Sequence, residues 1–477
     1  MRPSRSLWVS RGARPPLPPA VLAPLPPAVV AFIHWRTAQI ERLTARIAEL
    51  EAQVGKDSTN SSKPPSTEHP HAKPIRPKSK SKRPRGGQPG HTKHERTLIP
   101  VEDCLAVIPC VPTTCRRCGP SLSGSDPEPI RHQVWEFPEI RPIITEYQRH
   151  RLICGCGCST CGVLPPGVPT GQAGPRLIAF TGLLMACFRQ SKRRAALFLS
   201  TILKQPASPA WMVRLQNRAS AAVQPAYEEL AAALPSEKAL YLGESPSKEG
   251  PNKSWVWTFV AATFTIFACR LSRAAEVPKP LLGALAGVIH CDRARMYWAF
   301  DKLQYGRAHL KRDFQGLIDS PCGVTRRPGH DLMRPTDEMF GLWQKVRDGT
   351  LSRADFRAQM RAIRERAESV LLRGYFNPRV RGFCTDAREH RVRLWAFADV
   401  EGVEPTNNAA ERALRHAVIW RKLPFGTQSA SGSRFVERML SVIETCRQQK
   451  RDVLAWTVDA VQAHLADQPA PSLLSGA

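Results

Sequence analysis

The sequence predicts an α/β protein whose C-terminal half is built on a mixed β-sheet, with several smaller modules before it. Short strand-like segments separated by turns follow one another from Ala239 onward. A helix-length stretch then intervenes, and a further strand-like segment comes after it. Three strands, a crossover helix and a fourth strand are typical of a mixed sheet of the ribonuclease H type.

The length and charge of the chain limit its class. Its 477 residues suffice for several domains, and 69 Lys and Arg against 41 Asp and Glu give a formal net charge of +28. An excess this large indicates an anionic partner, of which nucleic acid is the commonest. No run of about 18 apolar residues is present, so the sequence predicts no membrane partner and a cytoplasmic protein.

Residues 1–29 are expected to be a disordered, Pro-rich extension. They start basic and turn apolar, as a signal peptide does, but eight prolines interrupt them.

Residues 30–55 are expected to form a leucine-zipper-like helix. Its apolar residues recur with a heptad period: Ile33, Ile40, Ile47 and Val54, with Leu43 and Leu50 between them. This pattern favours a parallel coiled coil that makes the protein a homodimer or higher oligomer. Packing of the helix against the chain's own body is the alternative.

Residues 56–100 are expected to form a basic, disordered linker. Within it, Lys73–Lys93 holds eight Lys or Arg and no acid. One interpretation is a solvated tail. The other is an arm whose cations contact DNA phosphates and give affinity with little sequence choice. The candidate DNA contacts in this arm are Lys78, Lys80, Lys82, Arg83 and Arg85.

Residues 101–170 contain a candidate zinc ribbon. Two cysteines separated by two residues can reach one zinc ion, and a strand-like pair, His132–Phe137 and Ile143–Ile153, leads to a second cysteine group. Clustered cysteines in a reducing compartment indicate a metal rather than disulfides. We expect four of six cysteines to bind a structural zinc ion, with free thiols as the alternative. The six are Cys115, Cys118, Cys154, Cys156, Cys158 and Cys161.

Residues 171–236 are expected to be a helical, helix-turn-helix-like region. One helix spans Ser191–Leu203, and a second begins at Ser208 after a short turn. The second helix carries Arg214 and Arg218, which suit an element that binds DNA. An ordinary helical hairpin is the alternative.

Residues 237–465 are expected to hold the mixed sheet, with a helical insertion at about residues 305–400 and a disordered tail at 466–477. The expected strands are Ala239–Leu242, Trp255–Ala262, Thr265–Leu271 and Gly287–Cys291, with a crossover helix at Ala274–Leu285. The expected helices after them are Ala308–Ile318, Asp337–Arg347, Ser352–Arg373 and Val392–Phe397. The basic residues on these helices fit a DNA-holding surface.

Two acids stand where a metal-dependent phosphodiester cutting site needs them. Asp292 follows the fourth strand, at the edge where such sheets place their ligands. Glu411 lies one helical turn after Asn407, on a helix that begins after Pro405. Cleavage of this kind uses two divalent ions about 4 Å apart, held by carboxylates from separate elements. The alternative is that Glu411 pairs with Arg415 on a solvated helix face.

Several motifs occur together in the chain. They are the cysteine ribbon, Ser61–Pro65 (SSKPP), Gly86–His91 (GGQPGH), Ala308–Arg312 (AHLKR) after Asp292, and Val403–Arg412 (VEPTNNAAER) followed by Arg421-Lys422. With these motifs the chain resembles transposases of the insertion-sequence 66 family over nearly its whole length.

The resemblance implies a DDE-type recombinase that cuts transposon ends and joins their 3′-hydroxyls to target DNA with two Mg²⁺ ions. It also implies accessory proteins encoded by the transposon and a bacterial, nucleoid-associated location. Site roles are implied for Asn407, Asn408 and His309, although His309 on an ordinary helix is an equal interpretation. The further DNA contacts implied are Lys311, Arg312, Arg421 and Lys422.

The chain departs from the family at the first strand. The family begins its motif there with Asp-Glu-Thr, whereas this chain has Gly243 and Glu244 in the first two places. Gly243 offers no side-chain oxygen, and Glu244 is a doubtful substitute because adjacent strand residues point to opposite faces.

Three hypotheses therefore remain open. The first is a transposase by descent whose catalysis is impaired or lost. The alternative is an inactive DNA-binding relic that occupies transposon ends without cutting them. A third hypothesis, a simple ribonuclease H-like nuclease, does not account for the zipper and the ribbon.

Overall fold

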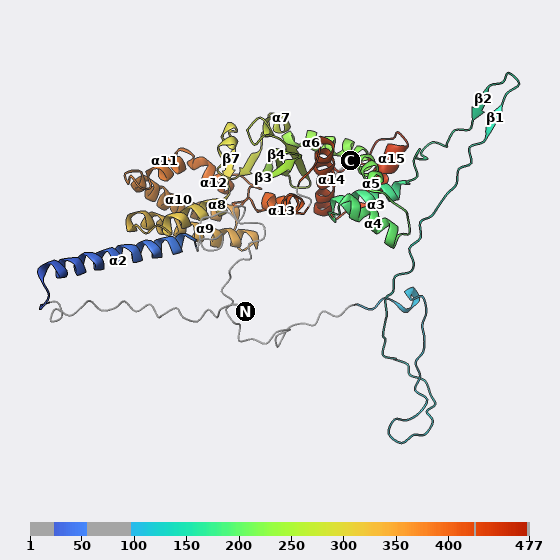
Figure 1. Cartoon of the computed structure of the whole chain (residues 1–477), viewed down its shortest axis with the longest axis horizontal. Coiled ribbons are helices and arrows are strands. Elements are labelled where there is room, and N and C mark those ends of the chain that lie inside the picture. Colours follow the sequence, from blue (N-terminus) through green and yellow to red (C-terminus); the bar gives the residue numbers. More distant parts are fainter. Residues whose placement is uncertain (1–22, 55–96, 424–425, 475–477) are drawn as a thin grey trace. The chain divides into compact units, whose positions relative to one another are not determined.

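The computed structural model describes residues 23–54, 97–423 and 426–474 (Figure 1). The chain divides into two compact units, which we call the insertion unit and the sheet unit. The insertion unit comprises Met1–Ala72 with Ala308–Arg391, and the sheet unit comprises Lys73–Arg307 with Val392–Ala477. Most of the predicted Pro-rich extension and the basic arm with Lys78, Lys80, Lys82, Arg83 and Arg85 lie outside the described residues.

The sheet unit is organised around a five-stranded sheet in the order β5-β4-β3-β6-β7. β3, β4 and β5 are antiparallel neighbours, whereas β6 pairs in parallel with both β3 and β7. The strands are β3 Ala239–Glu249, β4 Asn252–Val260, β5 Thr265–Arg270, β6 Val288–Cys291 and β7 Leu303–Tyr305. The prediction of an α/β protein with a mixed sheet is confirmed.

Buried apolar side chains explain why these segments form strands. Aromatic and β-branched residues such as Trp257, Phe259 and Ile266 are fully buried in β4 and β5. In the tight turn between β3 and β4, Gly250 has a φ of +56°, a conformation that favours glycine. Consecutive residues of β4 from Val256 to Val260 are buried, so both faces of this strand are covered.

The sheet differs from its predicted extent in several places, and β4 spans Asn252–Val260 rather than Trp255–Ala262. β3 continues past Leu242 because its pairing with β4 runs on to the turn at Glu249 and Asn252. The crossover helix is shorter than predicted: α7 spans only Pro278–Leu282, and Gly283 ends it with a φ of +49°. β7 was not predicted, because its three residues are too few to show a strand period.

The outer edge of β5 is covered by α14, Ala430–Gln449. Alternate N–H groups of β5 donate to α14 side chains one helical turn apart, over distances of 2.8–3.1 Å. Two residues along a strand and four along a helix both advance about 6 Å, so the two series stay in register. α14 therefore replaces the strand that this edge lacks. The pairs are Cys269 with Glu437, Phe267 with Ser441, and Thr265 with Thr445.

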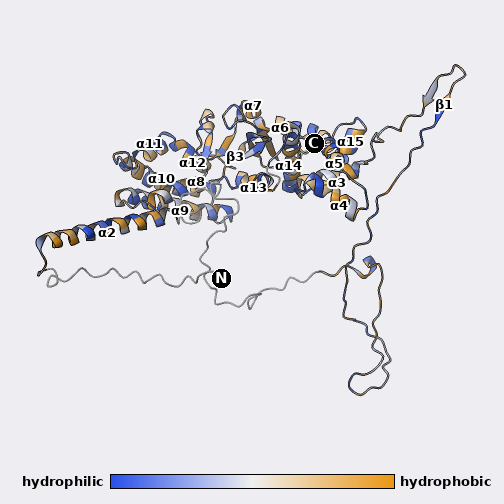
Figure 2. Cartoon of the chain, viewed as in Figure 1, coloured by the Kyte–Doolittle hydropathy of each residue, from blue (hydrophilic) through white to orange (hydrophobic). Residues whose placement is uncertain are grey.

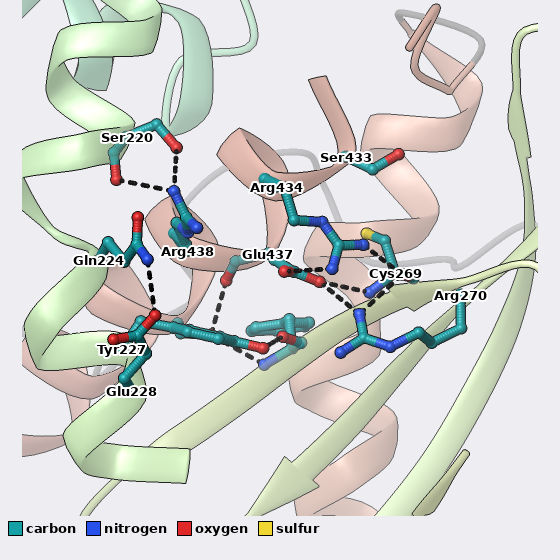
Figure 3. Close-up of polar contacts among 12 residues, drawn as sticks. Ser220, Gln224, Tyr227, Glu228, Cys269, Arg270, Ser433, Arg434, Glu437 and Arg438 are labelled. Carbon is teal, nitrogen blue, oxygen red and sulfur yellow. Dashed lines mark hydrogen bonds and ion pairs between the residues drawn. The ribbon is translucent and has the colours of Figure 1, made fainter. Parts of the chain in front are cut away.

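Glu437 is the charged member of this series, and two arginines surround it (Figure 3). Its carboxylate lies 2.9 Å from Arg270 and 2.9 Å from Arg434, while it also accepts the Cys269 N–H. Burial raises the pKa of Glu437, and the charge of Arg434 opposes that rise. The two guanidinium groups therefore compensate a carboxylate that the fold buries at a sheet edge.

Several helices pack together around α14, and one of them also contacts β5 (Figure 1). They are α3 Pro175–Ala186, α4 Lys192–Ile202, α5 Pro209–Ala222, α6 Gln224–Ala233 and α15 Val453–Leu465. Ser191 and Ser208 cap α4 and α5, because each hydroxyl accepts an N–H from the first turn of its helix. Both helices begin where the sequence predicts.

The insertion unit is helical. Its helices are α8 Arg307–Ile318, α9 Gly323–Arg347, α10 Arg353–Tyr375 and α11 Arg381–Glu389, and α12 Arg391–Asp399 leads back into the sheet unit. α10 buries Phe356, Met360 and Ile363 at helical spacing, so it packs on α9 and α11. α9 is longer than predicted, because its packed face continues through Pro328 and Pro335.

Two segments before α3 bury little apolar surface. α2, Pro27–Val54, is one helix along which apolar residues recur at intervals, and Ile40, Leu43 and Ile47 are exposed (Figure 2). The later segment contains the short helix η2, Val101–Asp103, and a small antiparallel pair, β1 Arg151–Ile153 with β2 Ser159–Cys161. The predicted strand at 132–137 pairs with nothing in the described part of the chain. None of the described helices is both long and apolar enough to cross a bilayer.

Candidate functional site

The candidate site lies where β3 and β6 run side by side. These strands pair in parallel, with Leu240 opposite Ile289 and Tyr241 opposite His290. Continuing this register places Gly243 level with Asp292. Gly243 and Asp292, the positions predicted for the first and second carboxylates, therefore lie on or directly after adjacent strands.

Helix α13, Asn408–Lys422, brings the third position to the same strand. Asn407 precedes α13, is 4% exposed and donates from Nδ2 to the carbonyl oxygen of Leu242 over 2.7 Å. Its side chain makes no capping hydrogen bond to the first turn of α13. Asn407 instead ties the start of α13 to β3, one residue before Gly243. Its Oδ1 is buried and accepts no hydrogen bond from the described residues.

Gly243 faces α13. A Cβ atom built on Gly243 would lie 2.7 Å from Leu414 Cδ1 and 3.5 Å from Ala410 Cβ. Glu411 follows Ala410 in the first turn of α13, and it is exposed. The first turn of α13 therefore lies over Gly243, and the side chain of Leu414 stands where a residue at 243 would extend.

Glu244 turns to the opposite face, as strand alternation predicts. Its side chain is 4% exposed, and its Oε1 accepts from Arg273 over 2.7 and 3.0 Å. The other oxygen accepts from the Tyr297 hydroxyl over 2.5 Å. Burial raises the pKa of Glu244, and the charge of Asp292 raises it further. Both oxygens are engaged by the protein, so Glu244 does not replace the missing carboxylate facing α13.

Asp292 bends the chain directly after β6. Its Oδ1 accepts the Ala294 N–H over 2.9 Å, which closes a short turn. Because Gly306 N donates to Cys291 O and Arg307 N donates to Pro405 O, both over 2.9 Å, the ends of β6 and β7 are linked to the loop before α13. Nowhere in the described ranges do three or more His, Cys, Asp or Glu side chains gather as a metal-binding group.

Arg307 supports this loop and was not foreseen from the sequence. Its side chain is buried, with Cζ 3.8 Å from the centroid of the Trp395 ring, and Nη2 donates to Leu394 O over 2.7 Å. Its own N–H donates to Pro405. Arg307 therefore connects α12 with the segment that leads to Asn407. A basic residue beside other basic residues gives no sequence signal of burial.

The remaining predicted site residues fall in several places. His309 and Arg312 bond each other in α8 over 2.6 Å, and Lys311 pairs with Asp337 within the insertion unit. In the sheet unit, Arg421 donates to Pro246 O over 3.1 Å. The exposed predicted residues of the sheet unit are Asn408, Arg214 and Lys422, and Arg218 is half-buried against Gly171.

The six cysteines do not form a four-thiolate group. Cys115 lies beside Cys118, and its pKa is lowered chiefly by the Arg117 backbone N–H. Cys154 lies beside Cys156, and its pKa is lowered chiefly by the Cys156 backbone N–H. The Cys154 N–H donates to Cys158 O over 2.9 Å, but no three of the six thiols gather as a metal-binding group, and all six are free thiols. The segment buries almost no apolar surface, so packing alone does not bring the pairs together.

Comparison with known proteins gives two family matches. Residues 170–434, more than half of the chain, match the family described as "Transposase IS66 family". Residues 27–97 match a family of unknown function. The first match covers Gly243, Asp292 and α13, and it begins shortly after the cysteine segment.

One relative is an uncharacterized protein, y4hP, of Sinorhizobium fredii. It is 24% identical over 425 residues, which cover 76% of this chain and 72% of the relative. Its name states no activity. The family match therefore carries the assignment, and the relative adds that the similarity extends beyond residues 170–434.

Proposed function

Because the chain belongs to the IS66 transposase family, we propose that it binds the ends of an insertion sequence and cuts and joins them to target DNA in a reaction that needs Mg²⁺. Asp292 and Glu411 act as the carboxylates of this reaction. Gly243 lowers its rate, because it leaves the first carboxylate position without an oxygen ligand.

The observation that carries this proposal is the convergence of separate elements at Gly243. Asp292 follows β6, the strand beside β3, and the first turn of α13 is fastened to β3 through Asn407. The order of three antiparallel strands, a crossover and a parallel strand supports a ribonuclease H type of sheet. Carboxylates held on rigid elements at a sheet edge suit a site for hard cations.

The donor set fits magnesium only in part. Carboxylate oxygens of Asp292 and Glu411 are suitable ligands: Asp292 follows β6, the strand beside β3, and Glu411 follows Ala410, whose Cβ would lie 3.5 Å from a Cβ on Gly243. Magnesium bound there would activate the attacking hydroxyl and stabilise the leaving oxygen. The residues of this chain provide two of the three expected carboxylates, and Glu244 is committed to Arg273 and Tyr297.

This incomplete set supports a second candidate function. A chain that keeps the DNA-binding elements but lacks one metal ligand would occupy transposon ends without cutting them. The specific observation in its favour is the side chain of Leu414 above Gly243, since this methyl group must shift before a metal ligand at 243 can enter. The other DNA contacts proposed for either function are Arg214, Arg218, Lys311, Arg312, Arg421 and Lys422.

The decisive experiment is a strand-transfer assay with the full chain, terminal-repeat DNA of its own element and Mg²⁺. We expect slow joining by the wild-type protein. Asp292→Asn and Glu411→Gln should each abolish it, because the shared cations lose a ligand, while binding of the same DNA stays within about twofold. Arg415→Gln, on the same helix, is the matched control and should join normally.

The outcomes separate the two candidates. Binding without joining, with no change on Asp292→Asn, assigns the non-cutting function. Joining that survives both carboxylate substitutions would falsify the proposed catalytic pair. A zinc ion on the cysteine segment and self-association through α2 are further parts of the proposal, and metal analysis of the purified chain tests the zinc.

A further inference from the structure

The insertion unit exposes an apolar cluster at the end of α10. Tyr375 is 40% and Phe376 71% exposed, and Leu372 and Val324 beside them are exposed as well. Asn377 connects the two parts, because its Nδ2 donates to Val324 O over 3.2 Å. Single exposed apolar residues are common, but a group of them with two aromatic rings indicates an interaction surface. We call these four residues the aromatic patch.

Contacts with neighbouring arginines and between the two rings hold the aromatic patch in place. Tyr375 and Phe376 pack edge to face with ring centroids 5.3 Å apart. Arg388 lies over the Tyr375 ring at 5.6 Å, and Arg381 Nε donates to Tyr375 O over 3.1 Å. These contacts fix Tyr375 and the backbone of the α10 end, while Phe376 presents most of its ring to solvent. A ring presented in this way loses little conformational entropy when it stacks on a ligand.

The charged side chains of the segment 372–382, which carries both aromatic rings, are all positive. Arg373, Arg379 and Arg381 are exposed, and no Asp or Glu occurs from Leu372 to Gly382. The nearest acid along the chain is Glu368, which is exposed and lies one helical turn before Leu372 in α10. Aromatic faces bordered by arginines complement a ligand that combines flat rings with phosphates.

We propose that the aromatic patch stacks on unpaired bases of the DNA that this protein handles, with Phe376 as the stacking ring and the arginines as phosphate contacts. The inference rests on the proposed function, since it takes the same DNA as the partner. Intact duplex offers phosphates but hides the faces of its bases, so the ligand is DNA whose bases are unstacked at a bulge, nick or end. An uncharged apolar protein partner would not explain why arginines border the aromatic patch.

The test measures binding of the full chain to two mixed-sequence DNAs. One is a blunt duplex, and the other is the same duplex with an internal bulge that contains 2-aminopurine. We expect wild-type protein to bind the bulged DNA more tightly and to quench its fluorescence. Phe376→Ala should weaken binding to the bulged DNA about tenfold and abolish quenching, with duplex binding unchanged, because only the stacking contact is lost. Phe376→Tyr should retain both signals.

Two controls complete the design. Phe188→Ala removes a phenylalanine of similar exposure in the sheet unit and should change neither affinity nor quenching. Arg379→Gln should weaken binding to both DNAs alike and reduce the salt dependence, as expected for a phosphate contact. Thermal unfolding of each variant checks that the fold is intact.

The results distinguish failure of this inference from failure of the proposed function. If wild-type protein binds both DNAs equally and Phe376→Ala changes nothing, the inference is overturned while the proposed function stands. If Phe376→Ala instead dissociates an oligomer without changing base preference, the patch is a contact between copies of the chain and the inference is again overturned. Absence of binding to any DNA contradicts the proposed function and the inference together.

Discussion

At the scale of single residues, Gly243 and Leu414 decide whether a carboxylate can occupy position 243 of the candidate site. A Cβ on residue 243 would lie 2.7 Å from Leu414 Cδ1, so an aspartate there requires this methyl group to move. We expect Gly243→Asp to raise the rate of Mg²⁺-dependent strand cleavage at least about a hundredfold, because it restores a ligand shared by the cations. The measurement is single-turnover cleavage of terminal-repeat DNA.

Leu414 provides the refinement of this experiment. Gly243→Asp combined with Leu414→Ala should cleave faster than Gly243→Asp alone, since the carboxylate then enters without displacing a packed side chain. Gly243→Asn is the size-matched control and should stay slow, because an amide lacks the charge. Equal rates for all three variants and the wild type would show that residue 243 takes no part in catalysis.

At the scale of elements, the edge of β5 depends on side chains of α14 rather than on another strand. Ser441 accepts the Phe267 N–H over 2.8 Å, and both groups are buried. We expect Ser441→Ala to lower the free energy of unfolding by about 1–3 kcal/mol, because a buried N–H loses its acceptor. Urea unfolding followed by circular dichroism measures the change.

Ser431 is the matched control for the α14 prediction. It is an exposed serine of the same helix and bonds only Ser429 among the described contacts. Ser431→Ala should change the free energy of unfolding by less than about 0.5 kcal/mol. If Ser441→Ala changes the free energy of unfolding equally little, the side chains of α14 do not stabilise the edge of β5.

At the scale of the whole molecule, the exposed apolar residues of α2 and the net charge of +28 both call for partners. We expect Ile40→Asp to shift the protein from an oligomer to a monomer, because it places a charge in the heptad seam. Sedimentation velocity at moderate salt measures the change. Arg42→Asp, off the seam, should leave the oligomer intact, and a wild-type protein that is already monomeric contradicts the coiled coil.

Much of the fold was predictable because local sequence patterns determine where its strands and helices begin. The strand segments of β3 to β6, the starts of α4 and α5 at Ser191 and Ser208, and the start of α13 after Asn407 all follow from short-range period, capping residues and proline. The family was recognisable for a related reason, since motifs such as Val403–Arg412 are contiguous in the chain. Motifs of this kind need no knowledge of tertiary contacts.

The sequence by itself determined an α/β chain with a large basic excess, and it predicted the site positions of Asp292, Glu411 and Gly243. Tertiary structure alone decided what those residues face. It bonds the Asn407 side chain to β3, turns the Glu244 side chain toward Arg273, and fills the space above Gly243 with the Leu414 side chain. These contacts join residues far apart in the chain, and their partners are chosen by packing of whole elements rather than by local pattern.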